Sequence, residues 1–384
     1  MHGLDVLLTT SVSFIITFLA IPIVLQIAEV KKLYDIPDER KLHNRPITSL
    51  GGVGIFAGFI LAALLSIQSQ NAADLQSFFA FFAAAIVIFF LGLKDDLMIL
   101  SASKKFIGQL LAASIIIHLG DIRLDSMYGL FGIEQLPEGF GLALSYLTII
   151  VVVNSFNLID GIDGLAASLG ILTTVVFGAY FFAINYQAYA LLAFAMAGSL
   201  GSFMIFNHHP AKIFMGDSGS LMLGMVNSIL VIKFINVAHE PLVAIPVTAS
   251  VALGFSILIV PLLDTLRVFG VRIANGKSPF TPDRNHVHHL LLDRGLSHPA
   301  IAFTCVAINI GFIVLAWFTR SLGTTYVLLI MLTLAFSGLA FLYYYKRPDR
   351  RMVVSKSKTG RTELKTSSKV VALTEEIGTR EKQN

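Results

Sequence analysis

Charged residues, cysteine and secretion signals are all scarce in this sequence of 384 residues. Only 14% of the residues are charged, whereas a soluble domain of this length would carry roughly 25%. The single cysteine, Cys305, lies inside an apolar run, which excludes a disulfide framework. No A-x-A-like cleavage site follows the first apolar run, so we expect that run to be a retained helix. With 55% hydrophobic residues, the composition indicates a polytopic membrane protein.

Eleven apolar runs approach or reach the length of roughly 17–25 residues that a membrane-spanning helix needs. They cover 4–28, 51–67, 75–93, 104–119, 140–158, 164–184, 187–206, 219–238, 241–266, 299–318 and 322–345. In the second run Gly54 and Gly58 form a GxxxG pair, which favours close helix packing. We therefore expect an all-α integral membrane protein, a bundle of about eleven transmembrane helices, with residues 1–345 as the catalytic domain.

The distribution of lysine and arginine predicts how this bundle is oriented. Connections on one side, beginning with 29–50 and including the C-terminal segment, hold 25 of the 28 basic residues. The opposite connections hold only Arg123 and Arg320, and Lys233 lies inside the eighth run. The positive-inside rule places the 25-charge side in the cytoplasm and the N-terminus outside. Every polar motif described below falls on that side, so we expect a multi-pass protein of the inner, or plasma, membrane with a cytoplasmic active site.

Residues 346–384 differ in composition from the rest of the chain. They carry 11 lysines and arginines against 5 acids, which is typical of a disordered segment. We expect a basic, disordered cytoplasmic tail outside the catalytic domain. It is either a solvated extension that follows the positive-inside bias, or a segment that rests on anionic lipid at about 1 kcal/mol per basic residue.

The stretch NSFNLIDGIDGLA, residues 154–166, is the most unusual part of the sequence because it places four polar side chains between two long apolar runs. Asn154 and Asn157 are spaced three apart, as are Asp160 and Asp163, so each pair can share a helix face. Carboxylates at the edge of hydrocarbon are costly and usually mark a substrate or ion site. The alternative, a polar turn that caps two helices, needs one such side chain rather than four.

Three further cytoplasmic motifs carry charge. The KDD motif contains Asp95 and Asp96, which repel each other and oppose their own helix dipole unless a cation lies beside them. The motif NHHPAKIFMGDSGS places Asp217 before an apolar helix, either as an ordinary capping residue or beside a phosphate at the helix N-terminus. The segment 283–289, DRNHVHH, has side chains for zinc or phosphate, and its arginine without any cysteine favours an anion. Solvated caps and loops are the simpler alternatives.

Together these motifs supply two complementary kinds of group. The oxygen ligands are Asp95, Asp96, Asn157, Asp160, Asp163 and Asp217, and the basic groups are Arg45, Lys105, Arg284, His288 and His289. Magnesium prefers carboxylate and amide oxygens with substrate phosphates, and manganese is the second ion we consider. Basic side chains would hold the remaining phosphate charge. This combination indicates phosphoryl transfer, in which positioning and charge neutralisation supply most of the rate, and the membrane location indicates a lipid substrate.

The ordered set KDD, NSFNLIDGIDGLA, MGDSGS and SPFTPDRNHVHHLL resembles the polyprenyl-phosphate N-acetylhexosamine-1-phosphate transferase family, glycosyltransferase family 4, over about residues 30–300. The HxHH pattern resembles the branch that uses UDP-GlcNAc and starts common antigen, O-antigen (lipopolysaccharide) or wall teichoic acid. The branch that uses UDP-MurNAc-pentapeptide for peptidoglycan usually shows three consecutive histidines. The resemblance implies transfer of a sugar-1-phosphate, with GlcNAc-1-phosphate expected, from the UDP-sugar to undecaprenyl phosphate, with release of UMP. Its implied partners are a UDP-N-acetylhexosamine, undecaprenyl phosphate, membrane lipid and a second copy in a homodimer, and no nucleic acid.

The resemblance also implies roles for individual residues. Asp217, Asn157 and Asp96 resemble magnesium ligands. Asp95 takes the position often proposed for a base acting on the lipid phosphate, but a phosphate monoester with a second pKa near 6 is already mostly ionised at pH 7. Asp95 can instead orient the phosphate or the metal. The implied catalytic set is Asp95, Asp96, Asp160, Asp163, His288 and His289, and the implied substrate-binding set is Asn154, Arg284, His286, Lys105 and Arg45.

A secondary transporter or nucleotide-sugar carrier is the rival class, because it too holds polar groups among helices. A carrier should place its site near the bilayer midplane on broken helices, often with an inverted repeat. In this sequence the acids lie at the ends of apolar runs on one side, and no internal repeat is evident. The pattern therefore favours an enzyme.

Overall fold

The protein is largely helical, and a computed structural model describes residues 3–34, 46–66, 72–276 and 286–344 with the strand residues 353–356, 362–366 and 369–373. The helices are α1 (Gly3–Lys31), α2 (Gly51–Ser66), α3 (Ala72–Leu97), α4 (Ala102–Ser114), the π-helical η1 (Ile115–Leu119), α5 (Glu138–Ile159), α6 (Leu165–Ala183), α7 (Gln187–Asn207), α8 (Gly216–Ala238), α9 (Ser250–Ile257), α10 (Ile259–Ala274), α11 (Val287–Asp293), α12 (His298–Thr319), the 3-10 helix η2 (Arg320–Leu322) and α13 (Thr324–Tyr344). The strands are β1 (Ser126–Leu130), β2 (Ile133–Gln135), β3 (Val353–Lys356), β4 (Thr362–Thr366) and β5 (Lys369–Leu373).

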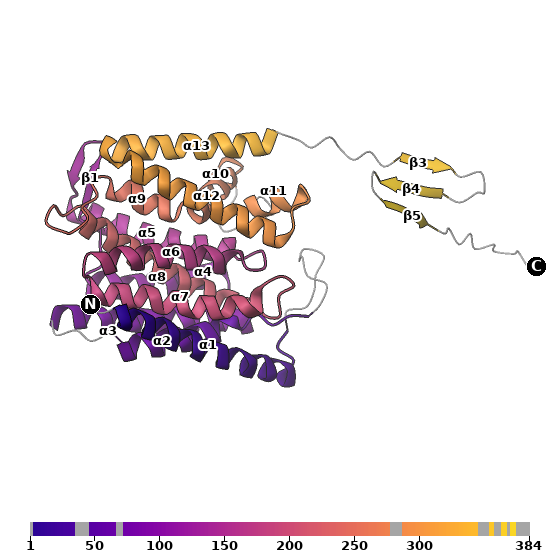
Figure 1. Ribbon diagram of the computed structural model, residues 1–384, viewed down its shortest axis with the longest axis horizontal. Coiled ribbons are helices and arrows are strands. Elements are labelled where there is room, and N and C mark those ends of the chain that lie inside the picture. Colours follow the sequence, from indigo (N-terminus) through magenta and orange to yellow (C-terminus); the bar gives the residue numbers. More distant parts are fainter. Residues whose placement is uncertain are drawn as a thin grey trace, which may run out of the picture. The chain divides into compact units, whose positions relative to one another are not determined.

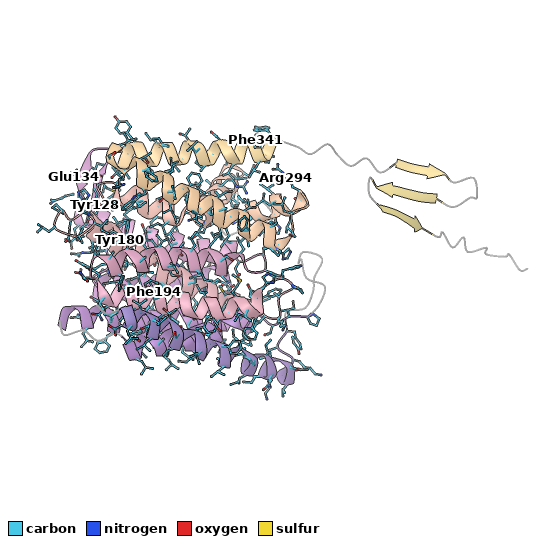
Figure 2. All side chains as sticks on the ribbon, viewed as in Figure 1. Tyr128, Glu134, Tyr180, Phe194, Arg294 and Phe341 are labelled. Carbon is cyan, nitrogen blue, oxygen red and sulfur yellow. The ribbon has the colours of Figure 1, made fainter. Side chains whose placement is uncertain are left out.

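The chain divides into two units, Met1–Ala335 and Phe336–Asn384. The first unit is a helical bundle in which α8 is almost wholly buried and packs against α2, α3, α5, α6 and α9. Figure 1 shows α11 at one end of this bundle and β1 with the N-terminus at the other. Figure 2 places Tyr128 and Glu134 at the β1 end and Arg294 toward the α11 end. The bundle therefore has two distinct ends, and the candidate site described below lies at only one of them.

Eight of the described helices are long and apolar enough to cross a bilayer, and the bent pair α9 and α10 adds a ninth if it counts as one span. The chain is therefore a polytopic helical membrane protein. The second and fourth predicted runs correspond to α2 and to α4 with η1, which are shorter than the others. The predicted total of eleven spans is not confirmed and stays a prediction.

The ninth predicted run, 241–266, corresponds to the bent pair α9 and α10 and not to one continuous helix. Its helical part begins only at Ser250, and the chain bends by 84° between α9 and α10. Pro261 lacks the N–H that a continuous helix would donate to the carbonyl of Ile257. The side chain of Asn309 from α12 fills the break, because it donates to that carbonyl at 3.0 Å and accepts from the N–H of Val260 at 3.2 Å. A broken span is stable where such side chains satisfy the freed backbone groups.

Close packing at the predicted GxxxG pair is confirmed. A Cβ at Gly54 would lie 2.7 Å from the Ile21 side chain, and a Cβ at Gly58 would lie 2.5 Å from the carbonyl oxygen of Ser13. Because glycine leaves this space empty, α2 can approach α1 closely, as small residues allow in membrane helices.

Short strands that were not predicted occur in two places in the described residues. In the first unit, β1 and β2 form an antiparallel hairpin in the connection before α5. In the second unit, β3, β4 and β5 form an antiparallel sheet in that order. The assignment of residues 346–384 to a separate disordered tail stays a prediction.

Candidate active site

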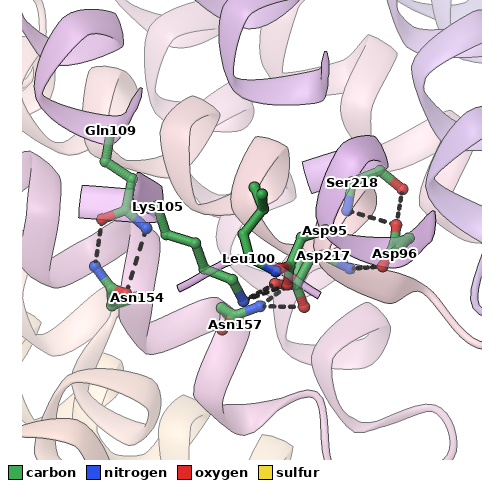
Figure 3. Close-up of polar contacts among 10 residues, drawn as sticks. Asp95, Asp96, Leu100, Lys105, Gln109, Asn154, Asn157, Asp217 and Ser218 are labelled. Carbon is green, nitrogen blue, oxygen red and sulfur yellow. Dashed lines mark hydrogen bonds and ion pairs between the residues drawn. The ribbon is translucent and has the colours of Figure 1, made fainter. Parts of the chain in front are cut away.

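Acidic residues from separate helices meet where α3 ends and α8 begins (Figure 3). Asp96 of α3 accepts hydrogen bonds from the backbone N–H groups of Asp217 (2.7 Å) and Ser218 (3.0 Å), and from the Ser218 hydroxyl (2.6 Å). The first N–H groups of a helix have no partner within it, so Asp96 satisfies two of them. Its charge opposes the dipole of α3 but complements that of α8. This contact explains why an acid is stable at the end of α3.

Glycine at two positions makes this close approach of α3 and α8 sterically feasible. A Cβ at Gly92 would lie 2.5 Å from the carbonyl oxygen of Asp217, and a Cβ at Gly216 would lie 2.7 Å from Oδ1 of Asp96. Gly216 also has φ of +69°, which a side chain would disfavour. The first N–H groups of α8, which the sequence suggested as a phosphate-binding site, are therefore hydrogen-bonded to Asp96.

The cation that the acids require comes from α4. The ammonium of Lys105 forms ion pairs with both Asp95 and Asp217, at 2.5 Å from Oδ2 of Asp217. Asp95 is further held by the backbone N–H of Leu100, which donates to its Oδ1 at 2.6 Å. The Asp95 side chain is 11% exposed and that of Asp217 is 24% exposed, so both carboxylates are largely shielded and Asp217 is the more exposed of the two. Two carboxylates thus share one positive charge.

The two asparagines of the 154–166 stretch have different partners. The Nδ2 of Asn157 donates to Oδ1 of Asp217 and to the hydroxyl of Ser220, each at 3.0 Å. The Nδ2 of Asn154 instead donates to Gln109 of α4 at 2.8 Å. Figure 3 shows this amide pair to one side of the carboxylates. Asn157 therefore belongs to the acidic cluster, whereas Asn154 links α5 to α4.

Asp160 joins this cluster electrostatically from the turn after α5. Burial, together with the negative charges of Asp217, Asp96 and Asp163, raises the pKa of Asp160 well above its usual range. A carboxyl group with a raised pKa close to other acids is typical of a functional site. The turn therefore faces the same centre as the ends of α3 and α8.

Asp163 has its own partners on the far side of that turn. Its Oδ2 lies 2.6 Å from Nδ1 of His209 and 3.4 Å from Nδ1 of His298, and the backbone N–H of Ala211 donates to it at 3.2 Å. Burial by itself would raise the pKa of Asp163, but the contacts with His298, His209 and Ala211 lower it below its usual range. Asp163 thus ties the turn to the loop after α7 and to the start of α12.

His288 and His289 lie on α11, and His286 directly precedes this short helix, in a segment that we predicted to be a loop. A Cβ at Gly161 would lie 2.5 Å from Nε2 of His288, so this ring rests directly on the turn beside Asp160. The ring of His289 is 4.4 Å from that of His288. Burial lowers the pKa of His288 to about 3, so it contacts the site as a neutral group. The acidic turn and the histidines therefore form one continuous site.

Known proteins resemble this chain over most of its length. Residues 78–235 match the model described as glycosyl transferase family 4. A probable undecaprenyl-phosphate N-acetylglucosaminyl 1-phosphate transferase of Bacillus subtilis (strain 168) is 34% identical over 297 residues, which cover 75% of this chain and 78% of that protein. The chain belongs to glycosyl transferase family 4.

Two other family-4 relatives extend the comparison. The decaprenyl-phosphate N-acetylglucosaminephosphotransferase of Mycobacterium tuberculosis (strain ATCC 25618 / H37Rv) is 32% identical over 74% of this chain and 75% of its own length. The undecaprenyl-phosphate alpha-N-acetylglucosaminyl 1-phosphate transferase of Escherichia coli (strain K12) is 28% identical over 88% of this chain and 91% of its own length. The family-model match contains α4 to α7, the end of α3 and most of α8, and thus the whole acidic cluster.

The donor set of this family-4 chain fits a magnesium ion. Asp95 and Asp217 present carboxylate oxygens, and the Lys105 ammonium between them marks a place where the structure stabilises positive charge. Carboxylate oxygens with substrate phosphates are the ligands that magnesium uses. The group Asp163, His209 and His298 has ligand atoms within 4.8 Å of one another, but its two nitrogen ligands suit zinc better than magnesium. We therefore associate magnesium with the acidic cluster.

The structure brings some of the predicted family-4 site residues together and leaves others apart. The contacting set is Asp95, Asp96, Lys105, Asn157 and Asp217, with Asp160 beside it and His286, His288 and His289 on α11 or next to it. Arg45 and Arg284 lie outside the described residues, so their roles stay predictions. Ser218, Ser220 and Gln109 were not predicted as site residues, and only their contacts reveal them. Asp264 was not predicted either, although an acid inside an apolar run usually indicates a functional site.

Proposed function

We propose that this protein transfers GlcNAc-1-phosphate from UDP-GlcNAc to undecaprenyl phosphate, releasing UMP and forming the lipid-diphospho-sugar that starts a cell-surface polysaccharide. The observation that carries this proposal is the convergence of Asp95 and Asp217 on the Lys105 ammonium at one end of a membrane bundle. The names of the family relatives, which specify N-acetylglucosaminyl 1-phosphate transfer to a polyprenyl phosphate, support the same reaction. The site chemistry and the family thus point to one transfer.

In this reaction an oxygen of the lipid phosphate attacks the phosphorus next to the sugar, and the bond from that phosphorus to the UMP oxygen breaks. Both reactants are anions, so the site must neutralise charge and hold them in line. Lys105 can bind a phosphate oxygen from its place between the two carboxylates. Asp217, with Asn157 and Asp96 in contact with it, would hold Mg²⁺, which supplies charge neutralisation on the diphosphate. Asp95 orients the ammonium and the incoming phosphate rather than removing a proton.

The turn and the histidines complete the proposed site. His288 is neutral because its pKa is lowered to about 3, so it can contact the diphosphate or the sugar through hydrogen bonds but adds no charge. Asp160 faces the metal-binding acids, and Asp163 orders the turn from the opposite side. Arg284 and His289 remain proposed contacts of the diphosphate or sugar.

We further propose that the site faces the cytoplasm of the plasma membrane, in a bundle of eleven spans with its N-terminus outside. The support is the bias of 25 of 28 basic residues toward the connections that carry these motifs. Undecaprenyl phosphate would enter sideways from the bilayer, and the UDP-sugar would enter from the cytoplasm. A homodimer is a proposed assembly that rests on no contact described above.

The direct test is UMP release by purified protein with Mg²⁺, undecaprenyl phosphate and each of UDP-GlcNAc, UDP-GalNAc and UDP-MurNAc-pentapeptide. UDP-GlcNAc should be the preferred donor, chelation should stop the reaction, and Mg²⁺ or Mn²⁺ should restore it. Asp217→Ala should abolish UMP release, whereas Asp125→Ala, which changes an acid at the other end of the bundle, should retain it. Preference for UDP-MurNAc-pentapeptide would reject the proposed donor. Uptake of UDP-GlcNAc into vesicles without turnover would favour the carrier.

A further inference from the structure

A buried acid in α10 is not used by the transfer chemistry described above. The Asp264 side chain is 1% exposed, and both of its oxygens have close partners. Oδ2 lies 2.8 Å from Nδ1 of His286, and Oδ1 accepts a hydrogen bond of 2.8 Å from the backbone N–H of Val287. Nη2 of Arg267, one turn along α10, is farther from Oδ1 at 3.8 Å. Asp264 therefore holds His286 and the first residue of α11 more closely than it holds this arginine.

The contact with His286 determines which imidazole nitrogen carries the proton. An ionised carboxylate only accepts hydrogen bonds, so Nδ1 must be the protonated nitrogen. Nε2 is then the nitrogen that can accept a hydrogen bond, and the carboxylate on the opposite nitrogen fixes the orientation of the ring. The His286 side chain is almost fully buried, so its ring has little space in which to turn. Asp264 thus sets both the tautomer and the orientation of this histidine.

The same anchor extends to the acidic turn through a series of contacts. The rings of His286 and His288 are stacked in parallel, with centroids 5.5 Å apart and an interplanar angle of 4°. His288 in turn rests on Gly161, where no space for a Cβ remains. Moving His286 would therefore move the ring that lies on the Asp160 turn. The bend between α9 and α10 is what brings Asp264 to this position, since α10 leaves the direction of α9 by 84°.

We propose that Asp264 is a positioning residue for the sugar-phosphate transfer: it holds His286 in the Nδ1-protonated tautomer and anchors the first turn of α11, so that the histidines lie against the Asp160–Gly161 turn. This inference rests on the proposed function. Asp264 itself does not touch the reactants. Its effect on catalysis passes through His286. An experiment can therefore distinguish this positioning role from a general contribution of Asp264 to folding.

The variant Asp264→Asn tests the inference because it keeps the size of the side chain. Its amide oxygen can still accept from the N–H of Val287, but its amide nitrogen would face Nδ1 of His286 and shift the imidazole proton to Nε2. We expect turnover to fall about 10- to 100-fold, the range found for groups that orient a metal-ligating histidine. Asp293→Asn, which changes an exposed acid of α11, should retain the wild-type rate.

A double-mutant cycle with His286→Ala separates positioning from folding. If Asp264 acts through His286, adding Asp264→Asn to His286→Ala should cause no further loss, because the two residues form one unit. In ¹⁵N spectra of protein with labelled histidine, the signal that His286→Ala removes should belong to an Nδ1-protonated ring, and Asp264→Asn should convert it to the Nε2-protonated form.

Each outcome of this experiment decides one question. The inference is overturned, and the proposed function stays intact, if the wild-type protein releases UMP but the turnover losses of the two single variants multiply in the double variant. An unchanged His286 tautomer in Asp264→Asn would overturn the inference in the same way. Absence of UMP release by the wild-type protein with every donor would overturn the proposed function and, with it, the role of Asp264 in transfer. Joint loss in the cycle together with the tautomer change would support the inference.

Discussion

The contact of Asp96 with the first turn of α8 predicts that this acid stabilises the fold in addition to its proposed place at the metal site, whereas its neighbour Asp217 serves chemistry alone. Replacing Asp96 by alanine removes three hydrogen bonds and leaves the N–H groups of Asp217 and Ser218 without their acceptor. Loss of a helix-capping side chain costs about 0.5–2 kcal/mol, and loss of a hydrogen bond to a charged group costs about 1.5–3 kcal/mol. These contributions overlap, and the cost of burying the carboxylate opposes them, so we expect Asp96→Ala to lower the free energy of unfolding by about 1–3 kcal/mol.

The variant Asp217→Asn should behave differently. Asp96 bonds the backbone of Asp217, which the substitution leaves in place, and Lys105 keeps its ion pair with Asp95. Partly exposed ion pairs contribute about 0–1 kcal/mol, so the stability of Asp217→Asn should lie within about 1 kcal/mol of wild type. Its UMP release should nevertheless be lost, because Asp217 is the residue on which the proposed metal site is centred.

Denaturant unfolding in detergent micelles, followed beside UMP release, measures both effects. Asp125→Ala is the matched control, since it removes an exposed carboxylate paired with Arg123 at the other end of the bundle and should change neither quantity. If Asp96→Ala unfolds at the wild-type denaturant concentration, the capping argument is wrong. If Asp217→Asn is as unstable as Asp96→Ala, the acids stabilise the bundle as one charged unit, and their division into structural and chemical roles fails.

Three other substitutions follow from the same geometry. Lys105→Met should lower turnover about tenfold or more. It should also lower the Mg²⁺ concentration that gives the half-maximal rate, because the ammonium no longer competes with Mg²⁺ for the carboxylates. A Mg²⁺ titration in which the variant needs a higher concentration than wild type would contradict this. Gly161→Ala should lower turnover about tenfold, since its Cβ would lie 2.5 Å from His288, whereas Gly311→Ala, which meets nothing within 4 Å, should retain the wild-type rate in the same assay. Folding lowers the pKa of Asp163, so its contribution to stability is complete above the unfolded pKa of about 3.9 and is lost as pH falls through the lower folded value. Unfolding of wild type and Asp163→Asn compared from pH 7 to 3 should show a smaller loss in acid for the variant, and equal losses would refute this linkage.

Much of the fold could be predicted because a bilayer selects for long apolar helices. The eight described helices that are long enough to span correspond in order to apolar runs, and the GxxxG pair marks a real close contact. The bend within the run 241–266 could not be predicted, because length and hydrophobicity do not show where a helix bends. The break near Pro261 is stable because Asn309, some fifty residues later, satisfies the freed backbone groups. A partner that lies so far along the chain cannot be recognised from the residues around the bend.

The chemistry of the site could be predicted from residue types, whereas its connections could not. Clusters of carboxylates, amides and histidines beside apolar runs indicated a phosphate and metal site before any geometry was known. The pattern gave no means of choosing Lys105 as the cation between Asp95 and Asp217, since it lies 112 residues away from Asp217. It also suggested that Asp217 or a bound phosphate would accept from the first N–H groups of α8, whereas in the structure Asp96 accepts from the N–H groups of Asp217 and Ser218.

Glycine next to an acid is the sequence signal that would have helped to identify which acids lie at a close contact between two segments. A buried carboxylate in a membrane bundle must obtain hydrogen bonds from another segment, because hydrocarbon supplies none. The segment that supplies them has to come within van der Waals distance, and that requires positions without a side chain. Gly92 precedes Asp96 by one turn, and a Cβ there would overlap the start of α8, which binds Asp96. Gly161 follows Asp160 directly, and a Cβ there would overlap the ring of His288. An acid with a glycine one residue or one helical turn away therefore predicts a close crossing of two segments, although it does not say which segment crosses. That second step needs the tertiary structure, and it is the step that assigns Asp96 to α8 and His288 to the Asp160 turn.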